Sequence, residues 1–384
     1  MKIGVIGVGR LGICVALLFE NCGYDILASD SRESYIRDLN DKKIDTTEPE
    51  VQRYLKDSTN IEFTTNNIRV IKECDIIYTF VATPSLEDGS YDVSAVWKVV
   101  DDIRSELPFE GKSLVIGCTT NPGDCDKIQK EVSSLGMDVY YNPEFIAQGS
   151  IIKDLQTADI VLIGGNGHRV PVIEKMYERI QLGYVIPSIH YMSTRAAEIV
   201  KIAINTYLTT KISYANVLGE VLIRSDLSDE VDSVLEAIGK DSRIGSKYLK
   251  FGYGFGGPCF PRDNRAFAAY ASKVGVEFNI GETTDNFNNE HAKFLVDYFV
   301  KRNVDNLPFC FDYITYKKGT DIITESQQLR LCEDLLELGY KVYVFEQKCV
   351  VDQIYDKIVS KFPGRIIFVY DESHVTEDVF PVKL

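Results

Sequence analysis

Short apolar runs rich in β-branched residues alternate with amphipathic stretches along the first half of the chain. The runs, which lie between residues 2 and 165, are KIGVIGV, YDILASD, CDIIYTFVAT, KSLVIGCTT, MDVYYN and DIVLIGG. Alternation of strand-like and helix-like segments is typical of parallel sheets, because each helix carries the chain back to the edge where the previous strand began. We therefore predict an α/β fold with a parallel sheet covered by helices on both faces.

The apolar period changes to that of a helix from about residue 193. The positions at helical spacing are Ala197, Val200, Ile204, Leu208 and Ile212. A polar segment with Pro308 follows, after which the β/α alternation restarts in PFCFDYI, QQLRLCEDLLELG, KVYVFE and RIIFVYD. We predict three domains: a large α/β domain over 1–192, a helical domain over 193–302 and a smaller C-terminal α/β domain over 303–384.

A glycine-rich turn joins the first predicted strand to the first predicted helix. The segment GVGRLG has GxGxxG spacing, and Asp30 ends the second apolar run about 20 residues later. In a Rossmann-like, doubly wound sheet such glycines bring the backbone close to a pyrophosphate, and the carboxylate accepts the ribose hydroxyls. We therefore predict NAD as the cofactor, although Arg32 leaves room for a contact with a 2′-phosphate. The predicted contacts here are Gly7, Gly9, Arg10, Leu11, Gly12 and Asp30.

The charge balance excludes one large class of partners. A formal net charge of -15 repels nucleic acid and anionic membranes, whereas a small anion can still bind in a locally cationic cleft. The nine cysteines include no CxxC pair, so we predict no metal site and expect a reducing, cytosolic compartment. No uncharged apolar run approaches the roughly 18 residues that a membrane helix needs, so we expect a soluble protein.

Polar loops that contain proline follow three of the predicted strands. They are VATPS at residues 81–85, CTTNPG at 118–123 and NPEF at 142–145. In open parallel sheets the ligand lies beyond the carboxyl ends of the strands, so three such loops on one edge favour a cleft over ordinary turns. Thr83, Pro84 and Thr120 are therefore further candidates for contacts with the cofactor.

A polar pair interrupts the apolar pattern of the long helical segment. Lys201 and Asn205 stand four residues apart and so project from one face of a helix. A solvated polar stripe is one interpretation of this pair. The other is that the ammonium and the amide point into a cleft, where they stabilise a developing oxyanion.

Cys259 stands in GFGGPCFPRDN, between a glycine run and a predicted helix that begins at Pro261. A helix N-terminus lowers the pKa of a thiol, and Arg262 adds to this effect. Asp263 opposes it unless its carboxylate faces away or shuttles protons from water. The glycines before Cys259 permit close approach of the backbone to a ligand. A dinucleotide fold with a thiol nucleophile predicts oxidation of a primary alcohol to an acid through a thioester.

Taken in order along the chain, these segments resemble those of the UDP-glucose and GDP-mannose dehydrogenase family. The matching segments are GVGRLG, Asp30, VATPS, CTTNP, NPEFIAQGS, AEIVKIAINTYLTTKIS, DSRIGSKYL, GFGGPCFPRD and KKGTD. The resemblance implies NAD-dependent, four-electron oxidation of the C6 alcohol of a nucleotide sugar, with UDP-glucose going to UDP-glucuronate and two NADH released. It also implies that the C-terminal domain holds the base and phosphates of the nucleotide.

The resemblance assigns roles to individual residues. The implied catalytic residues are Cys259 as nucleophile, Asp263 to assist the water, Lys201 and Asn205 for the oxyanion, Thr120 to position water and Glu144 as acid and base. The implied sugar-nucleotide contacts are Phe145, Ile146, Lys201, Asn205, Arg243, Tyr248, Lys250, Gly256 and Lys317. Arg243 matches an arginine that reaches the sugar of the neighbouring subunit, which implies a homodimer built on the helical domain.

Four positions depart from the family pattern. Arg262 replaces lysine, Gln148 replaces glutamate, Ile160 replaces arginine, and Thr324 replaces an arginine expected at the cofactor phosphate. The first change keeps the charge and the others remove one. Three alternatives to UDP-glucose oxidation therefore stay open: the same chemistry on GDP-mannose or a UDP-amino sugar, a single-step hydroxyacid dehydrogenase, and a nucleotide-sugar binder without catalysis.

Overall fold

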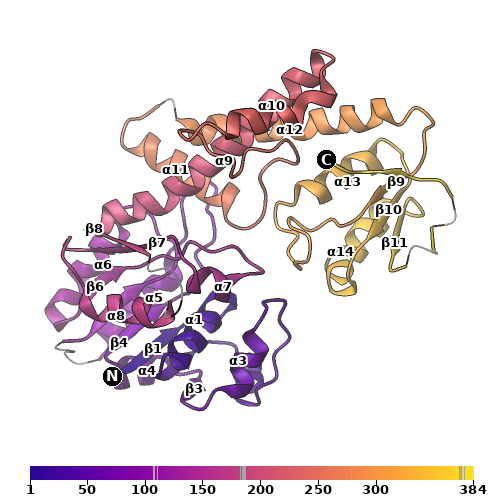
Figure 1. Cartoon of the computed structure of the whole chain (residues 1–384). Coiled ribbons are helices and arrows are strands. Elements are labelled where there is room, and N and C mark those ends of the chain that lie inside the picture. Colours follow the sequence, from indigo (N-terminus) through magenta and orange to yellow (C-terminus); the bar gives the residue numbers. More distant parts are fainter. Residues whose placement is uncertain are drawn as a thin grey trace. The chain divides into compact units, whose positions relative to one another are not determined.

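The computed structural model describes residues 1–384 except 107, 108, 110, 182, 184–186, 278, 372, 373 and 376. The chain divides into two compact units, Met1–Ile202 and Ala203–Leu384 (Figure 1). The long helix α9 (Thr194–Arg224) begins in the first unit and continues into the second. The units are therefore consecutive along the chain, and each builds its own core.

A single sheet forms the centre of the first unit. In the described part of the chain it has eight strands in the order β3-β2-β1-β4-β5-β6-β7-β8. The strands are β1 (Lys2–Ile6), β2 (Asp25–Ser29), β3 (Ile61–Thr64), β4 (Ile76–Thr79), β5 (Ser113–Ile116), β6 (Asp138–Tyr141), β7 (Ile160–Gly165) and β8 (Ser188–Ser193). Because the order reverses between β1 and β4, the carboxyl ends of these two strands flank the position where such sheets bind ligands.

Helices cover both faces of this sheet, as the alternating pattern predicts. One face packs against α1 (Arg10–Asn21), α2 (Glu33–Asn40), α3 (Val51–Asp57), α7 (Ile151–Gln156) and α8 (Pro171–Ile180). The other packs against α4 (Asn67–Glu73), α5 (Ser94–Arg104), α6 (Asp124–Val132) and the first turn of α9. Strand residues alternate between these cores: Val5 belongs to the first and Ile6 to the second.

Two features of the sheet differ from the sequence prediction. β7 pairs antiparallel to β6, whereas every other pair is parallel. The connection between them contains the short helix α7, of six residues, in place of the long crossover helix usual between parallel strands. The apolar pattern also missed β3 and β8, because half-exposed strands such as β8 lack a continuous apolar run.

The second unit begins with helices and ends with a small sheet. After α9 come α10 (Val231–Gly239), α11 (Phe260–Lys273) and α12 (Ile280–Arg302). The sheet order is β11-β10-β9-β12, all parallel, from β9 (Phe309–Phe311), β10 (Val342–Phe345), β11 (Ile366–Val369) and β12 (Phe380–Pro381). The predicted fold class, a large α/β sheet followed by a helical region and a smaller α/β sheet, is confirmed.

One face of the small sheet carries most of the core of the second unit. Helices α13 (Gln327–Glu337) and α14 (Lys348–Lys361) both pack there, together with apolar residues of α12 such as Phe299. The opposite face buries Tyr343 and Cys310 against side chains near the C-terminus. Throughout the described residues, no helix is both long enough and apolar enough to cross a membrane.

Candidate active site

The glycine turn after β1 has the geometry that its spacing predicts. Gly7 has φ of 89°, a backbone conformation that favours glycine. A Cβ on Gly12 would collide with the carbonyl oxygen of Gly7, so the turn closes only with glycine there. A Cβ on Gly9, the N-cap of α1, would meet nothing, so space remains open over the helix start. The turn therefore fits the pyrophosphate of a dinucleotide, which needs exposed N–H groups at a helix N-terminus.

Asp30 follows β2, where the ribose of a dinucleotide is expected. Its carboxylate accepts two hydrogen bonds from the Arg32 guanidinium, Nε to Oδ1 at 2.8 Å and Nη2 to Oδ2 at 3.0 Å. Burial works to raise the pKa of Asp30, but the hydrogen bonds and charge of Arg32 outweigh it and hold that pKa below its usual range. The guanidinium also stacks over the Tyr35 ring, 4.1 Å from its centroid. A cation therefore lies against the ribose acceptor.

Arg10 and Leu11, between the glycines of the turn, have separate environments. The Arg10 guanidinium donates to Thr47 at 3.2 Å and lies 3.9 Å from the carboxylate of Glu48. Leu11 packs against the core. The loop after β4 buries Thr83 and leaves Pro84 exposed. These four of the predicted cofactor residues thus follow β1 or β4, the two strands that flank the reversal of the sheet.

Glu144, which follows β6, is buried in a polar cluster of the first unit. Tyr177 of α8 donates from its hydroxyl to Glu144 Oε1 at 2.7 Å. Lys201 of α9 donates from Nζ to the Glu144 backbone oxygen at 2.9 Å and lies over the Phe145 ring. Burial raises the pKa of Glu144 to about 7, while the Tyr177 hydrogen bond and the Lys201 charge oppose this rise. A carboxyl that titrates near neutrality is suited to acid–base chemistry.

Thr120 is fully buried and is fixed by a carboxylate that the sequence analysis did not single out. Its hydroxyl donates to Glu198 Oε1 at 2.8 Å. The same carboxylate accepts from the backbone N–H groups of Gly123 at 2.5 Å and Cys125 at 3.0 Å, at the start of α6. Glu198 therefore anchors the whole CTTNPG loop to α9. The signal for it was weak: an acidic residue three positions before Lys201 on a helix.

Cys259 is the N-cap of α11 in the second unit, and its side chain is half-buried. The helix begins at Phe260, one residue before the predicted start at Pro261. Asp263, fully buried one turn later, accepts from Asn205 Nδ2 at 2.6 Å and from Arg262 Nε at 3.3 Å. The structure thus places Cys259, Asp263 and Asn205 at one end of α11, and their roles in catalysis stay a prediction.

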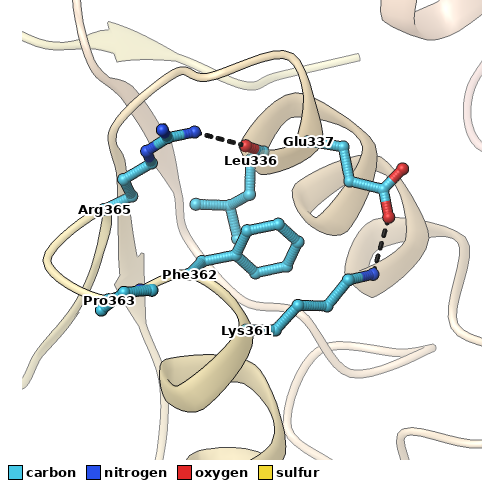
Figure 2. A pocket seen from close by; sticks show the side chains of 6 residues that line it. All are labelled: Leu336, Glu337, Lys361, Phe362, Pro363 and Arg365. Atoms are coloured by element: carbon cyan, nitrogen blue, oxygen red, sulfur yellow. Dashed lines mark hydrogen bonds and ion pairs between the residues drawn. The ribbon is translucent and has the colours of Figure 1, made fainter.

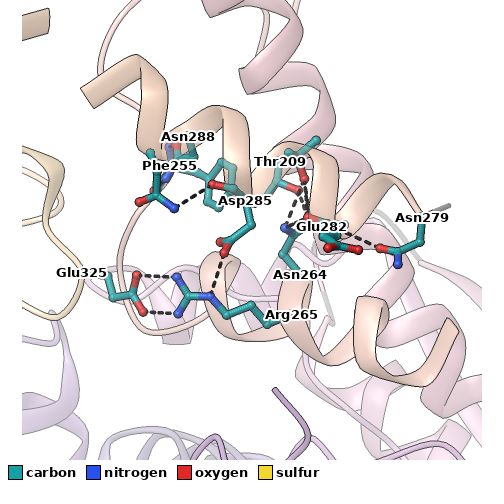
Figure 3. A network of polar contacts seen from close by, with 12 residues as sticks. Thr209, Phe255, Asn264, Arg265, Asn279, Glu282, Asp285, Asn288 and Glu325 are labelled. Carbon is teal, nitrogen blue, oxygen red and sulfur yellow. Dashed lines mark hydrogen bonds and ion pairs between the residues drawn. The ribbon is translucent and has the colours of Figure 1, made fainter. Parts of the chain in front are cut away.

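A network of polar contacts fixes α11 against its neighbours (Figure 3). Asn264, wholly buried, accepts from Thr209 of α9 at 2.9 Å and donates to the Gly281 carbonyl of α12 at 2.6 Å. Arg265 bridges Asp285 at 3.1 Å and Glu325 at 2.5 Å. Asn264 and Arg265, which directly follow Asp263, thus connect α11 to α9 and α12 by hydrogen bonds. These contacts fix the orientation of the start of α11.

The glycines before Cys259 are required by packing within the protein. A Cβ on Gly254 would collide with the Asn288 side chain, one on Gly256 with the Glu325 carbonyl, and one on Gly257 with the Tyr316 ring. Asn288 also binds both backbone groups of Phe255, at 2.8 and 2.9 Å (Figure 3). The close approach seen here is therefore to the chain itself, and approach of a ligand to this segment stays a prediction.

The remaining residues predicted to contact substrate are spread over both units. In the first, Ile146 is half-buried beside the core. In the second, Arg243 is exposed and pairs with Asp241 at 2.7 Å, and Tyr248 has φ of 62° with its ring edge-on to Phe260. Lys250 and Lys317 are exposed. The four side chains of the second unit lie at the surface, accessible to a ligand or to another chain.

The three charge-removing departures have distinct locations. Ile160 begins β7, Gln148 lies in the connection before α7, and Thr324 is exposed before α13. Beside Thr324, Glu325 has φ of 48° and pairs with Arg265. The segment is thus tied to α11 by the residue after the departure.

A pocket of about 470 Å³ lies at the C-terminal ends of α13 and α14 (Figure 2). Its cations are engaged within the protein: Lys361 pairs with Glu337 at 2.7 Å and Arg365 donates to the Leu336 carbonyl at 3.4 Å. No residue predicted to bind substrate or cofactor lines it. We assign this pocket no part in the reaction.

Comparison with known proteins decides the family. A model described as the UDP-glucose/GDP-mannose dehydrogenase family NAD binding domain matches residues 1–181, and the model of the central domain of that family matches residues 195–290. The chain belongs to the UDP-glucose/GDP-mannose dehydrogenase family. It is therefore an NAD-dependent oxidoreductase, and the predicted cofactor is confirmed.

Individual relatives are similar to this protein along most of its chain. It is 29% identical over 357 residues to the UDP-glucose 6-dehydrogenase TuaD of Bacillus subtilis, covering 90% of this chain and 76% of that protein. The solved structure of a UDP-glucose dehydrogenase from Pyrobaculum islandicum matches with a TM-score of 0.83 at 26% identity, over 96% of this chain and 86% of that one. A UDP-D-ManNAc dehydrogenase from Pyrococcus horikoshii has the same fold, with a TM-score of 0.77 at 23% identity over 90% of this chain and 83% of that one.

Replacement of Arg32 by alanine is expected to raise the preference of this family member for NADH over NADPH about tenfold, because loss of the two hydrogen bonds from the guanidinium leaves the Asp30 carboxylate to repel a 2′-phosphate. The measurement is the ratio of the two dissociation constants, read from nicotinamide fluorescence. Arg37→Ala removes the same charge from within α2, of which Arg32 is the N-cap, and should leave the ratio unchanged. An equal ratio in Arg32→Ala and the unaltered protein would contradict a role for Arg32 in cofactor selection.

Proposed function

We propose that this chain oxidises the C6 primary alcohol of a nucleotide sugar to the carboxylic acid, with UDP-glucose as the favoured substrate and UDP-glucuronate as the product. One observation carries the proposal. Cys259 stands at the N-terminus of α11 with buried Asp263 one turn behind it, bonded to Asn205. A single-step dehydrogenase needs no thiol, whereas oxidation from alcohol to acid gains from a nucleophile that holds the aldehyde.

Bound NAD supplies the hydride acceptor at each of the two oxidations. Glu144, which titrates near neutral pH, takes up the hydroxyl proton of the substrate through the water that Thr120 helps to position. The Cys259 thiolate then captures the aldehyde carbon, and Lys201 and Asn205 stabilise the oxyanion. Asp263 assists the water that finally opens the thioester. The balance is one alcohol, two NAD and one water, which give one carboxylate, two NADH and three protons.

We further propose the three-domain division at residues 192 and 302, with the C-terminal domain holding the nucleotide. A homodimer built on the helical domain would bring Arg243 to the sugar of the partner, which agrees with the exposure of this side chain. We also propose a reducing, cytosolic compartment, because the nine cysteines include no CxxC pair. Exposed Lys250 and Lys317 supply cations that an acidic protein needs to bind a nucleotide diphosphate.

The second candidate is the same chemistry on a UDP-amino sugar, which the likeness to the Pyrococcus horikoshii protein motivates. The test supplies purified protein and NAD with UDP-glucose, GDP-mannose and UDP-N-acetylmannosamine in parallel, and counts NADH per sugar consumed. We expect two NADH per UDP-glucose. Two NADH from another sugar alone would change the substrate, one NADH would indicate a single-step dehydrogenase, and tight sugar binding with no NADH would indicate a binder.

A further inference from the structure

Three buried polar residues of the first unit form a chain of hydrogen bonds that ends at Glu144. The Tyr177 hydroxyl lies 2.7 Å from Glu144 Oε1 and 3.0 Å from Asn142 Oδ1. Tyr177 and Asn142 are at most 2% exposed. Neither residue has a role in the reaction proposed above. The Tyr177 hydroxyl nevertheless lies within hydrogen-bond distance of both the Glu144 carboxyl and the Asn142 amide oxygen.

The direction of these hydrogen bonds follows from the chemistry of the groups. Asn142 donates from Nδ2 to the Leu162 carbonyl at 3.0 Å, so its Oδ1 is the atom that faces Tyr177 and can only accept. A tyrosine hydroxyl carries a single hydrogen and can donate to one oxygen at a time. An ionised carboxylate can only accept, whereas a protonated carboxyl can also donate.

Two complete arrangements result. When Glu144 is ionised, Tyr177 donates its hydrogen to Glu144 Oε1. When Glu144 is protonated, the carboxyl donates to the Tyr177 oxygen, and the tyrosine hydrogen turns to Asn142 Oδ1. When Tyr177 donates to Glu144, Asn142 Oδ1 still has the Tyr78 hydroxyl 3.4 Å away, so each of these groups keeps a partner in both states. This matters because an unsatisfied buried polar group costs about 1–3 kcal/mol.

We propose that Tyr177 is a positioning residue that rotates its hydroxyl hydrogen between Glu144 and Asn142, and so lets the buried Glu144 carboxyl change protonation state during each turnover. Tyr177 keeps its own proton throughout, and only the proton from the substrate arrives at and leaves Glu144. The inference rests on the proposed function in one respect, the role of Glu144 as acid and base.

The groups that face Glu144 come from three elements. Tyr177 belongs to α8, Lys201 to α9, and Tyr78 to β4, where its hydroxyl lies 3.4 Å from Asn142 Oδ1. Lys201 carries the one positive charge among them and favours the ionised carboxylate, against burial. Loss of the Tyr177 donor would weaken the ionised form more than the neutral one, because hydrogen bonds to charged groups are stronger. The midpoint of the Glu144 titration should therefore rise.

The test is Tyr177→Phe, with the protonation of Glu144 followed by infrared difference spectroscopy on the free protein. The carboxyl band is assigned by its loss in Glu144→Gln, and no turnover is needed. We expect the midpoint to rise by about one pH unit. Tyr78→Phe is the matched control: it also removes a buried hydroxyl near Asn142, but Tyr78 has no hydrogen bond to Glu144 and only a long one of 3.4 Å to Asn142, so the midpoint should rise much less than in Tyr177→Phe.

A second variant keeps the proposal testable if Tyr177→Phe does not fold. Asn142→Leu removes the alternative acceptor, so Tyr177 donates to Glu144 alone and the ionised form is favoured. The midpoint should then fall, opposite to the effect of Tyr177→Phe. An unchanged midpoint in Tyr177→Phe, an equal shift in Tyr78→Phe, or a rise in Asn142→Leu would each overturn the proposal.

Kinetics then separate this inference from the proposed function. In the active enzyme the acidic limb of the plot of kcat/KM against pH should move to higher pH in Tyr177→Phe, by the same amount as the infrared midpoint. If the infrared midpoint moves and the kinetic limb does not, Glu144 is not the base in turnover, while the hydrogen-bond switch stands. If neither moves, the switch itself is wrong.

Discussion

Replacement of Cys259 by serine is expected to reduce NADH production from UDP-glucose by about three orders of magnitude or more, the scale seen when a covalent nucleophile is removed. A serine hydroxyl is not ionised near neutral pH, so the N-terminus of α11 would have no thiolate to stabilise. The aldehyde would then be held weakly or as a stalled adduct. Steady-state NADH absorbance measures the rate, and mass spectrometry of the quenched protein detects an adduct.

The control for this loss is Cys349→Ser, which makes the same change at an exposed cysteine of the second unit. Its rate should match that of the unaltered protein. Turnover of Cys259→Ser within tenfold of normal, with two NADH per sugar, would exclude the thioester route. One NADH per sugar at an unchanged rate would point to a single-step dehydrogenase that does not use the thiol.

Replacement of Asp263 by asparagine is expected to slow steady-state turnover about a hundredfold or more, the usual contribution of a positioned acid–base group. In the structure Asp263 accepts a hydrogen bond from Asn205 at 2.6 Å. An asparagine in its place has no negative charge to accept a proton, and its NH2 group could face the Asn205 donor. The loss should fall mainly on thioester opening. Rapid mixing should therefore show a burst of two NADH per active site before the slow phase.

Asp285→Asn serves as the matched control, because Asp285 lies on the adjacent helix α12 and is also bonded to an arginine. It should keep both the burst and the steady rate. If the Asp263→Asn variant loses the NADH burst as fully as it loses the steady-state rate, its effect is not confined to thioester hydrolysis. That result would indicate damage to the start of α11.

Much of the candidate site could be predicted because its signals are local. A glycine at φ of 89° in the turn after β1, a proline in the first turn of α11, and proline loops after β4, β5 and β6 each act within a few residues of chain. Steric limits on the backbone angles of glycine and proline restrict the conformations at such positions, so the sequence pattern predicts the local geometry. The start of α11 was consequently predicted to within one residue.

Tyr177 and Glu198 could not be predicted in this way. Tyr177 stands in a helix whose apolar spacing is that of any core-facing helix, and Glu198 is one acidic residue in a long helical segment. Their contacts join residues 33 and 78 positions apart, to Glu144 and Thr120 respectively. Nothing in the local sequence states which side chain lies opposite.

The glycines of GFGGPCFPRDN also depend on contacts with distant residues, which the local sequence does not predict. Their number near a thiol indicates a close approach, and the structure confirms that a Cβ would not fit at Gly256 or Gly257. The neighbours that exclude it are Glu325 and Tyr316, more than 50 positions away along the chain by sequence numbering. The pattern predicted the requirement for glycine and not its cause.

The sequence by itself determined the α/β class, the NAD-binding turn, and the residue types on which the proposed oxidation through a thioester depends. These follow from short-range sterics and from the chemistry of single side chains. Only the tertiary structure decided the antiparallel pairing of β6 and β7, the partners of Glu144 and Thr120, and the anchoring of α11. Packing brings together groups that are distant along the chain, and in a buried site the neighbours of a carboxyl set the pH at which it changes charge.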